Sequence, residues 1–76
     1  MNAIDELAYR DPAKAIAVVD AAITARMTVT EVATFLGVGR AAIATWRAGE
    51  VRTLRPGTAR KVMELDRRVE RIGRGE

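Results

Sequence analysis

The strongest constraint on the fold is a short helix whose beginning and end are both marked in the sequence. Thr28 and Glu31 are spaced as a capping box, in which the threonine hydroxyl accepts from the Glu31 amide and the carboxylate accepts from the Thr28 amide. Met27 and Val32 are spaced to make the hydrophobic staple that accompanies such a box. Gly37 supplies the left-handed backbone conformation that a tight helix exit requires. The sequence therefore predicts a helix that begins at Thr28 and ends before Gly37.

The other helix boundaries follow from capping residues, prolines and glycines. Asn2 can cap a short helix that covers the core, and Asp11 caps a second helix with Pro12 in its first turn, where the missing N–H costs nothing. Gly49 closes a later helix, and Pro56 opens the last one. The predicted helices span about 3–9, 12–26, 28–36, 40–48 and 56–72. The fold class is therefore all-α, one compact domain over 1–76 with four to five helices.

The second of these helices is predicted to lie at the centre of the core. Val18 and several alanines leave much of its surface apolar, beyond the stripe that faces inward. That inward stripe is Ile16, Val19, Ala22 and Ile23.

Three missing residue types exclude most enzyme chemistry. The 76 residues contain no cysteine, no histidine and no serine. Disulfides, zinc-finger ligation, thiolate and serine nucleophiles and imidazole acid–base catalysis are therefore absent together. A single core of this size also leaves little room for a large cleft. We expect a protein that is not an enzyme and needs no cofactor, metal ion or small-molecule ligand.

No segment is expected to cross or enter a membrane. The most apolar stretch, Ala13 to Ala25, is interrupted by Lys14 and Asp20 and is shorter than the ~20 apolar residues that a bilayer requires. The first ten residues carry acidic side chains where a secretory signal would carry basic ones. The expected location is the cytoplasm or nucleoid of a bacterial host.

The distribution of charge is more informative than its sum of +3. Residues 1–38 contain three basic and five acidic side chains, whereas residues 39–76 contain ten basic and five acidic ones. An acidic first half joined to a basic second half predicts that one face contacts a polyanion. The alternative is a solvated, arginine-rich surface.

The segment from Val29 to Trp46 has the pattern of two short helices that meet across a tight turn. Its apolar or small positions are Val32, Ala33, Leu36, Val38, Ile43 and Trp46. Ala33 is small where the second helix crosses, and Val38 fills the turn from the core side. EVATFL followed by GVGRAAIATWRAG resembles the helix-turn-helix of the lambda repressor and Cro superfamily, also called the XRE family.

This resemblance covers about Pro12 to Leu65 and implies a lambda repressor-like fold with its helix-turn-helix core over 28–49. It implies that Arg40 to Ala48 is the recognition helix, which lies in the major groove of double-stranded DNA with its N-terminal residues at base edges. The helix over 56–72 corresponds to the scaffold helix that follows. The chain departs from the family by a short segment between these two helices and by the lack of a separate fifth helix.

The outward positions of the recognition helix give a chemical prediction. Arg40 is its only long hydrogen-bonding side chain at the leading end and is assigned as a bidentate reader of guanine O6 and N7, with a phosphate contact as the alternative. The methyl groups of Ala41, Ala44 and Thr45 can contact thymine, and the Thr45 hydroxyl can bond a base or a phosphate. Gly39 and Ala48 face the same way, while Ile43 and Trp46 face the core.

The usual adenine readers of the family are missing, because the chain has no glutamine and its only asparagine is Asn2. Val29 occupies the first motif position, where the resemblance implies a polar phosphate contact. Thr28 or Thr30, with the amides of that helix N-terminus, can serve instead. Specificity is therefore expected to be modest, centred on guanine and partly based on DNA shape.

Basic side chains near the end of the recognition helix are assigned to DNA phosphates, although each is equally a candidate for a solvated charge. These are Arg47, Arg52, Arg55, Arg60 and Lys61. The basic residues farther along the last helix alternate with acidic ones and are expected to form solvent-facing pairs. They are Arg67, Arg68, Arg71 and Arg74.

The last helix also carries an apolar seam of Val62, Leu65, Val69 and Ile72 at spacings of 3, 4 and 3. Two interpretations remain open for it. Either Val62 and Leu65 only close the core, or the distal part of the seam, from Leu65 through Val69 to Ile72, is a homodimer contact.

The sequence thus favours a transcriptional regulator that binds an inverted-repeat operator as a homodimer and represses by occluding a promoter. A domain of this size with no added ligand-binding part resembles phage Cro-type regulators. One alternative is an excisionase or MerR-type factor, to which TVTEVATFLGVGRAAI followed by AGEVRTLRPG is also similar and in which a β-wing follows the motif. Another is a protein-interaction module such as an antitoxin or anti-repressor.

Overall fold

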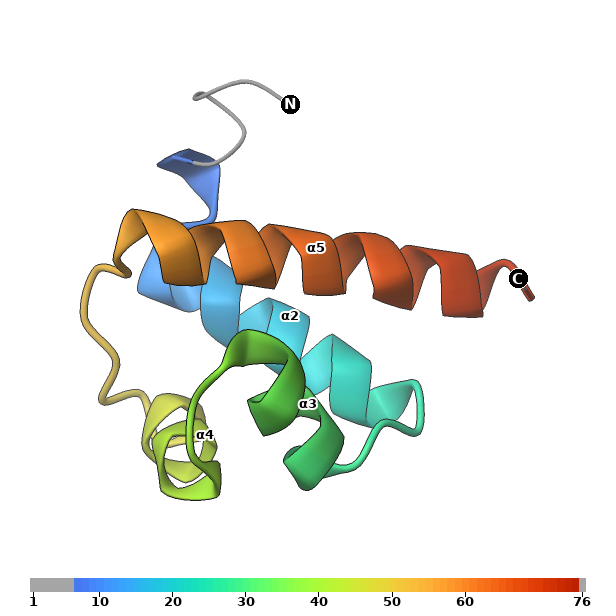
Figure 1. The fold of residues 1–76 in the computed structure, drawn as a ribbon, viewed down its shortest axis with the longest axis horizontal. Helices are drawn as coiled ribbons and strands as arrows, with labels where there is room; N and C mark the ends of the chain where they lie inside the picture. The colour runs from blue at the N-terminus through green and yellow to red at the C-terminus, as the bar shows by residue number, and fades with distance from the viewer. Residues whose placement is uncertain (1–6, 76) are drawn as a thin grey trace.

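The computed structural model describes residues 7–75, and this part of the chain is entirely helical (Figure 1). Its helices are α2 (Pro12–Thr24), α3 (Val29–Leu36), α4 (Arg40–Arg47) and α5 (Pro56–Gly73). The all-α prediction is confirmed, with four helices in the described residues. Most of the predicted N-terminal helix, including the Asn2 cap, lies outside them. Its described end is Leu7 and Ala8, followed by a turn at Tyr9 and Arg10, and Leu7 is largely exposed rather than covering the core.

Helix α2 lies at the centre of the core, as predicted, and it packs against α3, α4 and α5 (Figure 1). Asp11 caps it by accepting a hydrogen bond of 3.0 Å from the Ala13 amide. The fully inward positions are Ala15, Val18, Val19 and Ala22. Ile16 and Ile23 are partly buried and pack against this core, whereas Val18, which lay outside the predicted stripe, is buried within it. Small and β-branched side chains occupy the inner face because three helices approach it.

The predicted start of α3 is confirmed in detail. The Thr28 hydroxyl accepts a hydrogen bond of 3.0 Å from the Glu31 amide, and the Glu31 carboxylate accepts one of 3.1 Å from the Thr28 amide. Met27 and Val32, which flank this box, are both buried in the core. The cap thus fixes the angle at which the chain enters α3.

Helices α2, α3 and α4 all end in the same hydrogen-bonded turn, in which a residue with positive φ reverses the chain. Gly37 has a φ of 72°, its amide donates to Thr34, and the following Val38 amide donates to Ala33. The same pattern recurs after α4 with Gly49 and after α2 with Arg26, which is the only described non-glycine residue with positive φ. Helix α2 therefore ends at Thr24, two residues before the predicted Arg26. Each of these turns satisfies carbonyls that the helix end would otherwise leave unpaired.

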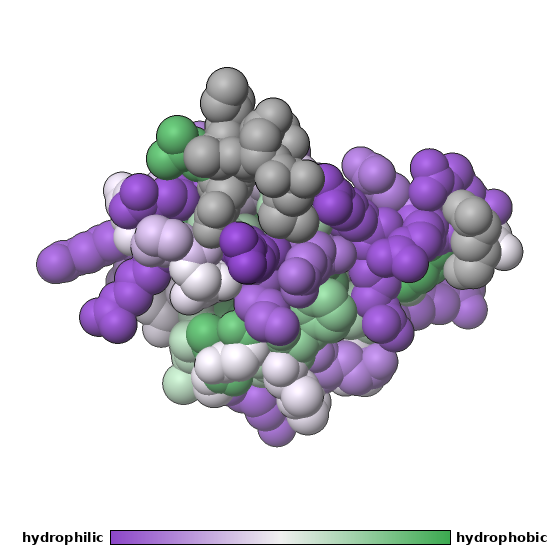
Figure 2. Space-filling model, turned by 45° about the horizontal axis from the view of Figure 1, so that its top comes forward, coloured by the Kyte–Doolittle hydropathy of each residue, from purple (hydrophilic) through white to green (hydrophobic). Residues whose placement is uncertain are grey.

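Helix α5 packs along α2 and α3 and carries the predicted seam only in part. Val62 and Leu65 are completely buried, whereas Val69 is partly buried and Ile72 is exposed. The proximal half of the seam therefore closes the core. Figure 2 shows hydrophilic side chains gathered over the C-terminal half of the helix. No helix within residues 7–75 combines the length and the apolar character needed to cross a bilayer.

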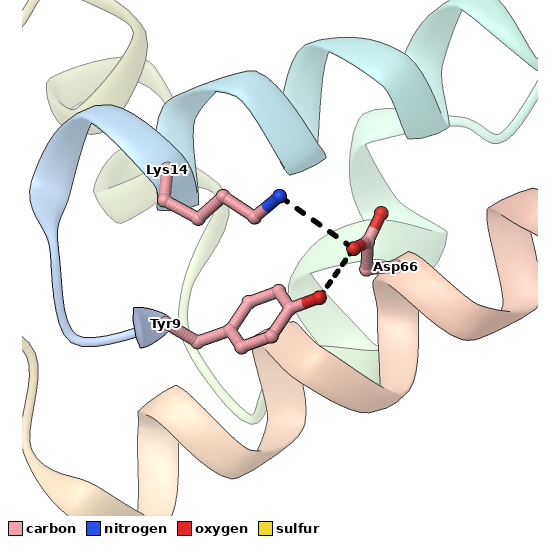
Figure 3. Close-up of polar contacts among 3 residues, drawn as sticks. All are labelled: Tyr9, Lys14 and Asp66. Atoms are coloured by element: carbon pink, nitrogen blue, oxygen red, sulfur yellow. Dashed lines mark hydrogen bonds and ion pairs between the residues drawn. The ribbon is translucent and has the colours of Figure 1, made fainter. Parts of the chain in front are cut away.

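A polar cluster ties the N-terminal turn to the middle of α5 (Figure 3). The Tyr9 hydroxyl donates a hydrogen bond of 2.5 Å to the Asp66 carboxylate. The Lys14 ammonium lies 3.9 Å from the same oxygen and 5.2 Å from the centre of the Tyr9 ring. One carboxylate thus joins side chains from the N-terminal turn and from α2.

Candidate nucleic-acid interface

Helix α4 has one buried face and one exposed face, as the sequence predicted. Ile43 is completely buried and Trp46 is 8% exposed, so both belong to the core. Three positions apart, these residues lie on one side of the helix, and the other side is left to solvent. The predicted base-reading residues all lie on that exposed side: Arg40, Ala41, Ala44 and Thr45. Gly39 and Ala48 are exposed as well.

The leading end of α4 presents main-chain amides beside Arg40 that no side chain caps. Gly39 is the N-cap residue and has no side chain to cap the helix, so the first-turn amides lack a side-chain acceptor. The partial positive charge of these amides adds to that of the Arg40 guanidinium. This end of the helix is thus suited to an acceptor-rich or anionic ligand.

A shallow hollow of about 370 Å³ lies between the start of α3 and the exposed face of α4. Its apolar wall is built from Val29, Ala41, Ile43 and Ala44, and its basic side chains are Arg40 and Arg47. Val29 therefore acts as a wall of the hollow. From the sequence, Val29 was predicted only to lack the expected phosphate contact, and its apolar side chain at the first motif position was the signal that could have indicated this wall.

The structure restricts the predicted role of Thr45. Its hydroxyl donates a hydrogen bond of 3.0 Å to the Ala41 carbonyl one turn earlier in α4. In this rotamer the oxygen can only accept a further hydrogen bond, for example from an exocyclic amine of adenine or cytosine. A phosphate contact, which needs a donor, requires the hydroxyl to leave Ala41.

The two threonines assigned to phosphate are placed differently from the α4 residues. Thr28 is occupied by its capping box, and the Glu31 carboxylate puts a negative charge at the same helix end. Thr30 lines another hollow, between α3 and α5, together with Phe35 and Arg68. The structure therefore does not gather Thr28 and Thr30 with the hollow beside α4.

The predicted phosphate-binding side chains are all exposed: Arg47, Arg52, Arg55, Arg60 and Lys61. Two of them are already paired. The Arg47 Nε donates a hydrogen bond of 3.0 Å to Asp20 of α2, and the Lys61 ammonium lies 3.7 Å from Glu64. Exposed pairs of this kind are weak and exchange with other charged ligands.

The loop that carries Arg52 and Arg55 is fixed to the N-terminal turn. The Arg10 Nε donates a hydrogen bond of 2.9 Å to the Leu54 carbonyl, and the Leu54 amide donates one of 3.1 Å to the Arg10 carbonyl. The Leu54 side chain is buried, which anchors the loop further. Neither Arg10 nor Asp20 was singled out from the sequence. Their partners lie 44 and 27 positions away, and no local pattern reports such pairs.

The packing of α5 leaves only part of the predicted dimer contact accessible to a second copy. Leu65 is completely buried in the core of the same chain, so its assignment to a contact between copies is corrected. Val69 remains partly exposed, and Ile72 is 37% exposed at the distal end of the helix. Beside them, the Arg68 guanidinium lies 5.9 Å from the centre of the Phe35 ring rather than in a solvent-facing ion pair.

Comparison with protein-family models, with curated proteins and with solved structures found no match to this chain.

Proposed function

We propose that this protein binds double-stranded DNA in a sequence-specific manner and represses transcription by occupying operator DNA. The single observation that carries the proposal is the exposure of Arg40, Ala44 and Thr45 on one face of α4, while Ile43 and Trp46 hold the opposite face in the core. A helix presented in this way beside a short preceding helix is the arrangement that enters a major groove. The proposed family is the lambda repressor and Cro superfamily, which the motif resembles.

In the proposed complex, the N-terminal end of α4 faces base edges. Arg40 reads guanine through its guanidinium, and the apolar wall formed by Ala41 and Ala44 contacts thymine methyl groups. Arg52 and Arg55 contact phosphates from the loop that Arg10 holds in place. Contacts to phosphate fix the position of the protein, and contacts to bases supply the specificity.

We further propose that the repressor acts as a homodimer on an inverted repeat. The apolar residues left for a contact between copies are Val69 and Ile72, at the distal end of α5. Ile72→Asp would place a charge in that contact and is expected to shift the protein to monomer in sedimentation equilibrium. The matched variant Leu7→Asp changes another exposed apolar residue, and it should leave the association state unchanged.

The function is tested by selecting bound sites from randomised duplexes and then comparing variants on the selected site and on random DNA at one fixed salt concentration. Arg40→Ala should remove most of the preference for the selected site, since a bidentate arginine–guanine pair supplies about 1–3 kcal/mol of discrimination. Arg52→Ala should weaken binding to both duplexes alike. Arg71→Ala, a matched loss of charge on the distal half of α5, should change neither binding appreciably.

Two results would contradict these assignments. Equal losses on both duplexes for Arg40→Ala would remove its reading role and leave a phosphate contact. Failure of the wild-type protein to bind any duplex at low salt would overturn the function itself. A stable complex with another protein, found alongside that failure, would favour the antitoxin or anti-repressor alternative. The excisionase and MerR-type alternative has less support, because residues 7–75 contain no strand and Pro56 begins a helix where a β-wing would follow.

A further inference from the structure

A carboxylate lies directly against the proposed DNA-binding surface. The Asp20 Oδ1 of α2 accepts a hydrogen bond of 3.0 Å from the Arg47 Nε, near the end of α4. Arg47 lines the same hollow as Arg40, Ala41 and Ala44. Both side chains of the pair remain about half exposed, at 51% for Asp20 and 47% for Arg47. The pair is therefore open to solvent and to any ligand that reaches the hollow.

We infer that Asp20 is an internal competitor of the DNA phosphates for Arg47, and that it weakens and tunes the affinity of the proposed repressor. This inference rests on the proposed function. A carboxylate oxygen and a phosphate oxygen are both anionic acceptors for the same guanidinium donors. When DNA arrives, a phosphate either displaces Asp20 from Arg47 or shares the guanidinium with it. The nearby negative charge also repels the DNA backbone.

The exposure of the pair makes this exchange possible. Ion pairs between solvent-exposed side chains are weak and are screened by salt, so a phosphate can displace the carboxylate. A buried pair would instead resist opening. While Asp20 is paired with Arg47, Arg47 contributes less than a full positive charge to the surface. A contact between Arg47 and a DNA phosphate then releases fewer counterions.

The fold of α4 does not depend on this pair. Ile43 and Trp46 are buried, and α4 packs against both α2 and α3 through its apolar face. Gly49 closes the helix through main-chain hydrogen bonds. Removing the charge of Asp20 therefore leaves the position of α4 intact, and its main effect falls on the electrostatics of the surface.

The test is Asp20→Asn, which keeps an oxygen acceptor for Arg47 but removes the negative charge. Binding to a random-sequence duplex is measured by fluorescence anisotropy over a range of salt concentrations. D20N is expected to bind about three- to tenfold more tightly than wild type, with a log–log salt slope steeper by about 0.9, the value for one further phosphate contact. Glu70→Gln, on the distal half of α5, produces the same change in net charge away from α4 and is the matched control.

A second pair of variants assigns the effect to Arg47. In an Arg47→Ala background, Asp20→Asn should lose most of its effect on affinity and slope, because the side chain that Asp20 occupies is gone and only the repulsion between Asp20 and the DNA backbone is left to relieve. The unfolding temperatures of D20N and wild type should agree.

Three results would overturn the inference. If D20N matches E70Q in affinity and slope while wild type binds DNA, this inference fails and the proposed function stands. If D20N binds more weakly, Asp20 supports the DNA contact by positioning Arg47 instead of opposing it. If no variant binds DNA at all, the proposed function fails, and this inference fails with it.

Discussion

Tyr9 and Asp66 meet across 57 positions of the chain, with the phenol donating a hydrogen bond of 2.5 Å to the carboxylate. This contact fastens the N-terminal turn to α5 and leaves Asp66 shared with Lys14 (Figure 3). The hydrogen bond to Asp66, with partial burial and the negative charges of Asp66 and Glu70, raises the pKa of Tyr9 to about 12. An ionised phenol would lose its donor and face the carboxylate as a like charge.

Because the pKa of Tyr9 is raised in the folded state, part of the free energy of unfolding is lost at alkaline pH. Because the folded state holds the phenolic proton more tightly than the unfolded state, this contribution is complete below pH 10 and is lost as pH rises through about 12. Tyr9→Phe should lower the free energy of unfolding by about 1 kcal/mol at neutral pH, since the contact is partly exposed. The difference between wild type and Y9F in denaturant unfolding should shrink between pH 10 and 12.

Tyr9 is the only tyrosine, so its titration can be followed directly by phenolate absorbance. Asp66→Asn should move the midpoint back towards 10, because both the charged acceptor and its repulsion are removed. A wild-type midpoint near 10 would show that the contact does not form in solution.

The parts of the fold predicted correctly are those encoded within a few neighbouring residues. The capping box at Thr28 and the exit at Gly37 each depend on side chains or φ values within one helix turn, so α3 was bounded correctly. The end of α2 was predicted two residues too late because Arg26 adopts a positive φ, and an arginine in the sequence does not indicate that conformation. Leu65 was assigned both to the core and to the dimer contact, because the spacing of apolar residues identifies a seam on the helix but not how far along that seam the core extends.

In the candidate site, too, features encoded by neighbouring residues were predictable and contacts between distant residues were not. The inward and outward faces of α4 follow from the 3.6-residue period, so the exposure of Arg40 and the burial of Trp46 were predictable. The links of Arg47 to Asp20 and of Arg10 to Leu54 depend on how helices and loops cross in space. A single sequence carries no local pattern for such pairs, and they decide which charges are free to meet a ligand.

Gly37 should be required for its backbone conformation rather than for its small size. A Cβ at this position would have nothing within 4 Å, yet φ is 72°. Gly37→Ala should therefore cost about 1–2 kcal/mol in urea unfolding. Gly57→Ala is the control, since it also has open space but lies in the first turn of α5 without positive φ. G57A should be neutral or stabilise by about 0.5 kcal/mol. A similar loss for both variants would contradict the conformational argument.

Arg26 is the counterpart of Gly37 at the end of α2, and here glycine should be an improvement. Its φ of 74° strains a residue with a Cβ, and its side chain is exposed. Arg26→Gly should raise the free energy of unfolding by about 1 kcal/mol, because the relief of strain exceeds the added flexibility of the unfolded chain. Arg26→Ala retains the Cβ and should not stabilise. Equal effects of the two variants in thermal unfolding would show that the arginine charge, not φ, controls this position.

Arg10 should act on DNA binding from a distance, through the loop that it holds. Arg10→Ala removes the hydrogen bond to the Leu54 carbonyl and should lower the hydrogen-exchange protection of the Leu54 amide by about fivefold, the equivalent of about 1 kcal/mol. The freed loop would present its basic side chains less often, so affinity for DNA should fall as well. Arg52→Ala removes the same charge from the loop itself and should weaken DNA binding while leaving Leu54 protected. If R10A leaves the Leu54 amide as protected as in wild type, the hydrogen bond from the Arg10 side chain is not what fixes the loop. The buried Leu54 side chain and the main-chain hydrogen bond to the carbonyl of residue 10 would then hold it.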